Sequence, residues 1–148
     1  MQIISPDTLN HIGAKIILIG MATKTVNAER TTGNRVALES ARKGLAASED
    51  DYEKAMGELA TDQRTWVETL FAKPLEMARA GHDDCNEAVY MAQIKWADDQ
   101  VRELEAITTE LKDARSEWVQ VAMSYDVTAY QVAKMCGRTP STVQRWVK

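Results

Sequence analysis

The chain has 148 residues, of which 45% are hydrophobic and 27% charged, and its formal net charge is −4. These values are typical of one ordinary globular domain, or of a small domain with an appendage. The most apolar stretch, residues 14–22, is about half as long as a membrane-spanning helix and follows no basic region, so we expect neither a membrane protein nor a signal peptide. The two cysteines form no CxxC pair, which argues against a disulfide scaffold and favours a reducing, cytoplasmic setting.

Helix-forming residues dominate the chain, and only seven Gly and three Pro interrupt it, so we expect an all-α fold. The first helix should begin at Pro6, because Ser5 can cap it and Asp7 complements the positive end of the helix dipole. Apolar residues then recur at helical spacing, at Leu9, Ile12, Ile16 and Ile19. Residues 31–34 are poor helix formers, so we expect a break there, with Asn34 as the cap of the next helix.

Residues 35–79 again show helical spacing, with interruptions expected at several points. Gly44 and the polar run at residues 48–51 are expected to divide this segment into two helices, because Ser48 and Asp51 resemble a capping box. Pro74 should kink or restart the helix, and Gly81 resembles a C-terminal cap.

Residues 82–125 contain no Gly or Pro, and we expect them to form one long helix. Its apolar residues recur seven apart, at Tyr90, Ala97, Leu104, Leu111, Trp118 and Tyr125, with Ile107, Ala114 and Val121 in a second seam position. This pattern is typical of a coiled coil or a long antiparallel helical hairpin, so either the earlier helices or a second chain should cover the apolar stripe. The tryptophans are most simply core residues or interface anchors, and Trp96, which lies outside the seam, could mark a contact surface.

The charge is distributed unevenly along the chain. Residues 126–148 carry four basic residues and one acidic residue, a net charge of +3. Residues 1–125 carry 14 basic and 21 acidic residues, a net charge of −7. The C-terminal end therefore suits a polyanion, whereas the rest of the chain would repel one.

Two short helices are expected in this basic end. Asp126 and Thr128 can cap a helix over residues 129–136, and Thr139 can cap a second helix that begins at Pro140. Gly137 fits the turn between them, where a positive φ is needed. We assign the contacts between the two helices to Val132, Ala133, Gly137, Val143 and Trp146, with Met135 or Cys136, and we expect Cys136 to be a packed, inert thiol.

The stretch AYQVAKMCGRTPSTVQRWVK is similar to the helix-turn-helix of the homeodomain-like DNA-binding group, as in resolvase and transposase tails and in small actinobacterial or phage regulators. The matching positions are Ala133, Gly137, Thr139, Ser141, Thr142, Val143, Arg145 and Trp146. Residues 117–128 resemble the first helix of the same trihelical unit, and the resemblance does not extend to the residues before them. The residue after the glycine is usually an apolar Val or Ile, and here it is Arg138.

The resemblance implies that residues 140–148 form a recognition helix in the DNA major groove. The residues that would read base edges are Ser141, Thr142, Gln144 and Arg145, and those that would approach phosphates are Lys134, Arg138, Thr139 and Lys148. We therefore expect a helix-turn-helix unit over residues 116–148 that binds double-stranded DNA. Because one such unit contacts few bases, we expect the helices of residues 1–115 to form a homodimer of a transcription regulator.

Two other functions stay open at this point. The helical N-terminal part could be a protein-interaction module, such as a phage-type inhibitor or assembly factor, with an accessory DNA-binding tail. An architectural nucleoid protein is a third reading, which the acidity of the chain disfavours.

No enzyme, cofactor or metal site is expected. His82 and Cys85 lie beside two aspartates, but no second ligand pair has matching spacing, so a helix start is the simpler interpretation. The chain has no nucleophile elbow, no phosphate-binding glycine loop and no HExxH motif.

Overall fold

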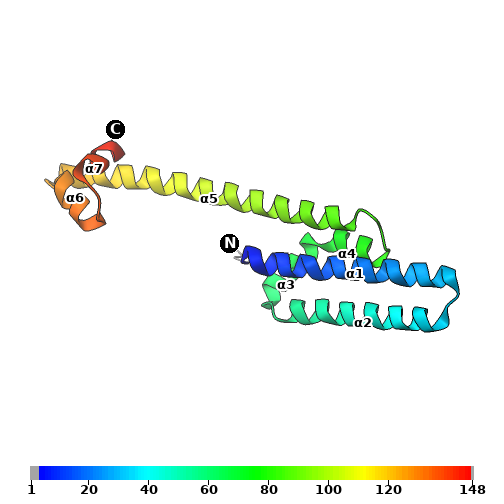
Figure 1. The fold of residues 1–148 in the computed structure, drawn as a ribbon. Helices are drawn as coiled ribbons and strands as arrows, with labels where there is room; N and C mark the ends of the chain where they lie inside the picture. Colours follow the sequence, from blue (N-terminus) through cyan, green and yellow to red (C-terminus); the bar gives the residue numbers. More distant parts are fainter. Residues whose placement is uncertain (1–3, 148) are drawn as a thin grey trace. The chain divides into compact units, whose positions relative to one another are not determined.

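The computed structural model describes residues 4–147, which form seven α-helices and no strand (Figure 1). The fold is all-α, as the composition predicts. The chain divides into two compact units, Met1–Asp98 (unit 1) and Asp99–Lys148 (unit 2). The long helix α5, Cys85–Ser124, contributes residues to both units. The sequence predicts the domain boundary after residue 115, whereas the structure places it after Asp98, and both positions lie within α5.

In unit 1, helices α1 (Pro6–Thr32) and α2 (Arg35–Gly57) run side by side as an antiparallel pair (Figure 1). The amide of Thr8 donates to Ser5 Oγ at 3.1 Å, so Ser5 caps α1 as predicted. Gly33 ends α1 with a φ of 71°, and the amide of Ala37 donates to Asn34 Oδ1 at 3.1 Å. The predicted break at residues 31–34 is therefore confirmed.

Helix α2 continues through Gly44 and residues 48–51, so the expected division of this segment was wrong. Tyr52 and Met56 on this helix are buried in the core. Glu49 accepts two hydrogen bonds from Arg79, at 3.0 and 2.9 Å. These tertiary contacts keep the polar run helical, because packing overrides the weak local preference of a few residues.

Two short helices follow, α3 (Thr61–Leu70) and α4 (Ala72–Arg79). They are separated at Phe71, whose side chain is fully buried. Pro74 lies in the first turn of α4, where a proline removes no hydrogen bond that the helix would otherwise make. The helix therefore restarts near Pro74, as predicted, and Gly81 follows α4 with a positive φ of 68°.

The core of unit 1 is built from apolar residues of five helices, together with Ile4 before α1 and Phe71 between α3 and α4. The predicted apolar repeat of α1 is buried throughout, and the core comprises Ile4, Leu9, Ile12, Ile16, Ile19, Tyr52, Ala55, Met56, Val67, Phe71, Ala78, Cys85, Val89 and Trp96. Trp96 is only 8% exposed, and its ring centroid lies 6.2 Å from that of Trp66. Trp96 is therefore a core residue and does not mark a contact surface. Trp96 lies outside the seam of the seven-residue pattern because its side chain packs on a different side of α5.

Glycine permits a close approach between α1 and the unit 1 part of α5. A Cβ atom at Gly13 would lie 2.9 Å from Val89 Cγ1 and would also meet Gln93 Oε1.

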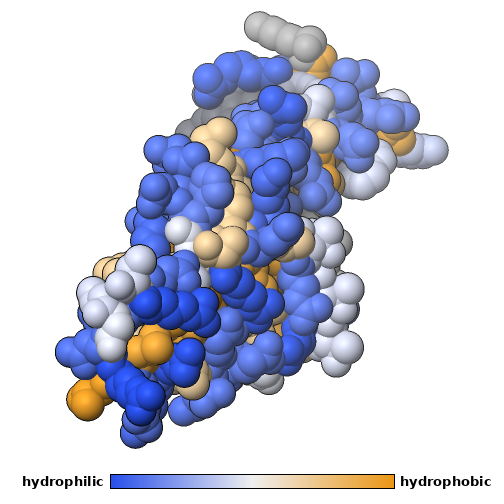
Figure 2. Space-filling view, turned by 90° about the vertical axis from the view of Figure 1, so that its right-hand side faces the viewer, coloured by the Kyte–Doolittle hydropathy of each residue, from blue (hydrophilic) through white to orange (hydrophobic). Residues whose placement is uncertain are grey.

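Seen from the side of the turn between α1 and α2, the nearest part of the surface is mostly hydrophilic, with small apolar areas between (Figure 2). Among the residues that the structure describes, no helix combines the length and apolarity that a bilayer crossing requires.

Candidate nucleic-acid interface

In unit 2, two short helices, α6 (Ala129–Cys136) and α7 (Pro140–Trp146), pack on the end of α5 (Figure 1). Helix α6 has the bounds expected from the sequence, and α7 begins at Pro140 as expected, but α7 ends at Trp146 and not at residue 148. The buried core of this unit consists of Val119, Val132, Ala133 and Val143, with Met123, Val127, Ala129, Trp146 and Val147 partly buried against it. The assigned residues Val132, Ala133 and Val143 thus lie inside the core, and Trp146 lies at its edge.

A reciprocal pair of hydrogen bonds fixes the start of α6. The amide of Gln131 donates to Thr128 Oγ1 at 3.2 Å, and the amide of Thr128 donates to Gln131 Oε1 at 2.8 Å. This capping box satisfies two backbone donors that a helix start leaves unpaired. Asp126, the other expected cap, instead adopts a left-handed conformation with a φ of 70° in the turn before α6.

The connection between α6 and α7 depends on the backbone conformation of Gly137. Its φ is 66°, and the amide of Arg138 donates to the carbonyl oxygen of Ala133 at 2.8 Å, which closes the end of α6. A Cβ atom at Gly137 would meet nothing within 4 Å, so the positive φ alone favours glycine here. The amide of Thr142 then donates to Thr139 Oγ1 at 3.3 Å, which caps α7.

The residues expected to read bases fall into two groups. Ser141, Gln144 and Arg145 are exposed, and their spacing places them on one side of α7, away from the buried Val143. Thr142 is half-buried, its hydroxyl lies 2.9 Å from that of Thr139, and it accepts a hydrogen bond from Arg145 Nη2 at 3.1 Å. Thr142 therefore orients the Arg145 side chain, and its hydroxyl is less available to a base edge.

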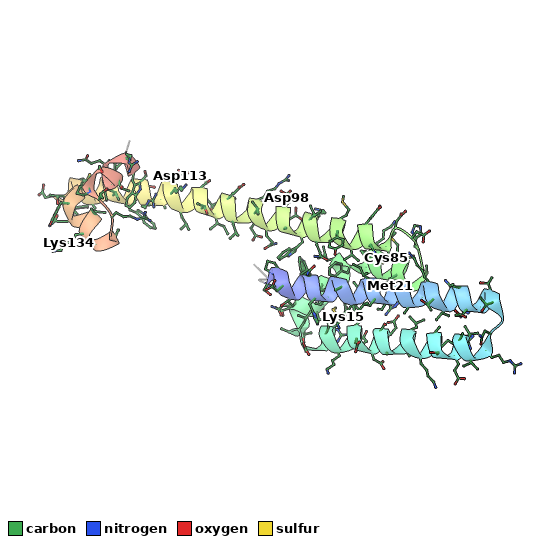
Figure 3. The ribbon with its side chains drawn as sticks, in the orientation of Figure 1. Lys15, Met21, Cys85, Asp98, Asp113 and Lys134 are labelled. Carbon is green, nitrogen blue, oxygen red and sulfur yellow. The ribbon has the colours of Figure 1, made fainter. Side chains whose placement is uncertain are left out.

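The residues expected to contact phosphates are also on the surface. Lys134, which Figure 3 labels on α6, is exposed, as are Arg138 and Thr139. Lys148 lies outside the described residues. Because Arg138 is exposed, it does not fill the interior position that Val or Ile usually fills in the motif that the sequence resembles. Residues 126–147 thus present three exposed cations, including Arg145, against a single exposed acid, Asp126.

Met135 and Cys136 do not join the core, contrary to expectation. Met135 is 79% exposed and Cys136 is also exposed. Helix α6 ends at Cys136 and the chain turns at Gly137, so only the earlier residues of α6 are covered by α7. Cys136 is therefore an accessible thiol and not a packed one.

Two contacts between α5 and α7 were not predicted. The guanidinium of Arg115 lies over the ring of Trp146, with its Cζ atom 3.9 Å from the ring centroid. Gln120 Nε2 donates to the carbonyl oxygen of Val147 at 3.4 Å. The sequence shows no signal for either contact, because both residues occupy ordinary polar positions of a long helix. Together they help to hold α7 against α5.

Within residues 4–147, no three or more His, Cys, Asp or Glu side chains cluster closely enough to hold a metal ion. His82 lies just before α5, where its Nδ1 accepts a hydrogen bond from the amide of Asp84 at 3.1 Å. No protein-family model, curated protein or solved structure matches the chain.

Proposed function

We propose that the protein is a sequence-specific DNA-binding regulator of transcription, that it acts as a dimer, and that the end of α5 with α6 and α7 forms its helix-turn-helix unit. The observation that carries the proposal is the outer side of α7. There Ser141, Gln144 and Arg145 are exposed on a helix whose opposite side, at Val143, is fixed in a small core. A rigid helix with exposed hydrogen-bonding side chains suits the DNA major groove.

The side chains on this face have the chemistry that base recognition requires. Arginine donates two parallel hydrogen bonds to guanine O6 and N7, and glutamine both donates to and accepts from adenine. One N–H of Arg145 is engaged by Thr142, which leaves further N–H donors of the guanidinium for a base. We therefore assign guanine contact to Arg145 and adenine contact to Gln144.

The exposed cations near α7 supply the second part of a DNA interface. Lys134 and Arg138 would bind phosphates and fix the register of the helix, with Thr139 and Lys148 as further contacts assigned from the sequence. The remainder of the chain is acidic, so nonspecific binding along its whole length is disfavoured. Binding is thereby restricted to the basic C-terminal end.

The proposal is tested by selecting binding sites from a random DNA pool with the full-length protein at ~150 mM salt, where nonspecific phosphate binding is weak. We expect an enriched palindrome. Arg145→Ala should weaken binding to that site by about 1–3 kcal/mol. Arg42→Ala is the matched control, because Arg42 is an exposed arginine on α2.

Two results would contradict the proposal at different levels. If the folded protein enriches no sequence, DNA recognition is not its function, and the acidic helices of unit 1 become the candidate for a protein-binding surface. If Arg145→Ala and wild type discriminate equally between the selected site and random DNA, Arg145 does not read a base.

A further inference from the structure

One side of α5 within unit 2 is apolar and uncovered. Its large apolar residues are Val101, Leu104, Ile107, Leu111, Trp118 and Val121, with exposed fractions of 51, 50, 39, 62, 68 and 50%. Every side chain from residue 101 to residue 113 is exposed. Figure 3 shows the side chains of α5 standing out from the helix between the labelled Asp98 and Asp113. We use the name α5 stripe for six residues of this side of the helix: Leu104, Ile107, Leu111, Ala114, Trp118 and Val121.

The α5 stripe is separate from the side of α5 that packs on α6 and α7. Val119 is buried in the unit 2 core and Met123 is partly buried against it. Trp118, one residue before Val119 and so about 100° around the helix, is 68% exposed. The core of the helix-turn-helix unit therefore leaves the stripe uncovered.

The spacing of the stripe is that of a coiled-coil seam. Leu104, Leu111 and Trp118 lie seven apart, and Ile107, Ala114 and Val121 follow them three residues later. Two helices that carry the same seven-residue pattern can interlock their side chains along its whole length. A second copy of this chain carries the same pattern in the same register, so the stripe is complementary to itself.

The two borders of the α5 stripe differ in charge. One border carries Glu103, Glu110 and Glu117, each one residue before a seam residue. The other border carries Thr108, Arg115 and Ala122, each one residue after a seam residue. Arg115 is the only charge on this second border. Its guanidinium stacks on Trp146 and its Nε atom is buried, so a partner would be contacted by its terminal nitrogens.

We propose that the α5 stripe is the seam of a parallel, in-register coiled coil with a second copy of the chain. In a parallel pair the acidic border of one helix faces the other border of its partner, so Glu110 lies beside Arg115 of the second copy. In an antiparallel pair like borders face each other, and the glutamates would repel. The charges therefore select the parallel arrangement.

Parallel pairing also deepens the proposed function. It brings the two copies of α6 and α7 to the same end of the coiled coil, as the binding of two DNA half-sites requires. This role rests on the proposed function, but the pairing itself does not, and it is measured without DNA. A dimer that binds no DNA would contradict the DNA binding in the proposed function and leave the pairing intact. A monomer that binds DNA would contradict the pairing, and with it the dimer in the proposed function, but not the DNA binding.

The pairing is tested by sedimentation of the full-length protein. We expect a molar mass of twice the 16.5 kDa of one chain, and Leu111→Glu should return it to a single chain. Ala106→Glu is the matched control, since it adds the same charge at an exposed position of α5 outside the stripe. Retained helical circular dichroism in both variants shows that each still folds. A monomeric wild type, or equal effects of the two substitutions, overturns the proposal.

Orientation is tested by disulfide cross-linking of Leu104→Cys in a Cys136→Ser background, because Cys136 is exposed and Cys85 is buried. Parallel in-register helices bring the two residues at position 104 together, so this variant should cross-link to itself. Antiparallel helices would instead cross-link a Leu104→Cys chain to a Val121→Cys chain. That second result, without self-cross-linking, overturns the parallel arrangement.

The charge pairing is tested by Glu110→Lys, which places a lysine beside Arg115 of the second copy. We expect the dimer dissociation constant to rise by roughly tenfold, because two attractive contacts become repulsive. Asp113→Lys changes the net charge equally at an exposed position away from the stripe and should have a smaller effect. Equal effects of the two lysines would show that Glu110 faces no basic residue.

Discussion

The guanidinium of Arg115 stacks on the indole of Trp146 at 3.9 Å, and this contact joins α5 to the last turn of α7. Arg115 lies one residue outside the α5 stripe, and Trp146 lies at the edge of the unit 2 core. The same arginine therefore adjoins both the helix that is proposed to read DNA and the surface that is proposed to bind a second copy.

Loss of this stacking should destabilise unit 2. We expect Arg115→Ala to lower the free energy of unfolding of α6 and α7 by about 1 kcal/mol, the usual size of a partly buried cation–π contact. The measurement is urea unfolding followed by NMR signals of the α7 amides, in a Leu111→Glu background that removes any contribution from chain pairing. Lys112→Ala, at an exposed position of the same helix, is the control. If both alanines have the same effect, the stacking contributes nothing.

At two glycines with open surroundings, substitution by alanine should change the stability of the protein in opposite directions. Gly137 has a φ of 66° and Gly44 lies within α2, and a Cβ atom at either would meet nothing within 4 Å. We expect Gly137→Ala to destabilise by about 1–2 kcal/mol, because alanine is strained at positive φ. Gly44→Ala should stabilise by about 0.5–1 kcal/mol, because alanine favours a helix interior. Thermal unfolding of both variants tests this prediction. If the two melting temperatures shift in the same direction relative to wild type, the prediction is wrong.

The two cysteines should differ in reactivity. Burial raises the pKa of the Cys85 thiol, so less of it is the reactive thiolate at a given pH, and its side chain is also inaccessible. Cys136 is exposed. At about pH 8 we expect iodoacetamide to modify Cys136 in the native protein and Cys85 only after unfolding, because Cys136 is accessible and Cys85 is buried. Mass spectrometry of tryptic peptides locates the label. Equal native labelling would contradict the burial of Cys85.

Phosphate contacts should be visible in the salt dependence of DNA binding. Lys134→Ala and Arg138→Ala should each weaken binding to all sequences and reduce the slope of log affinity against log salt by about 1. Fluorescence anisotropy at several salt concentrations measures the slope. Lys43→Ala, an exposed lysine of α2, should leave it unchanged. An unchanged slope for Arg138→Ala would place that residue away from the DNA backbone.

The helix ends could be predicted from the sequence because they depend on local chemistry. Ser5 with Pro6, Asn34 after Gly33, and Thr139 with Pro140 each satisfy backbone donors within a few residues of themselves. Such signals need no knowledge of the tertiary structure.

The predictions from the sequence that were wrong concern positions whose structure depends on tertiary contacts. The polar run at residues 48–51 resembles a helix boundary, yet contacts of Glu49 with Arg79 and burial of Tyr52 hold α2 straight through it. Trp96 was judged by its place in a seven-residue repeat, but it is buried because it packs on Trp66. Cys136 has helical spacing from Val132, but the chain turns before anything covers it. The base-reading assignments on α7 and the phosphate assignments in and around α6 and α7 stay predictions.

The bare stretch of α5 at residues 101–113 has a consequence for proteolysis. Because no side chain there is buried, neither hydrophobic core supports this part of α5 in a single chain, so it should open more readily than the packed ends of the helix. Transient local opening exposes its backbone to a protease, and Arg102 and Lys112 are trypsin sites within it. Brief trypsin treatment of dilute protein should cut here first and release two fragments, each with its own hydrophobic core.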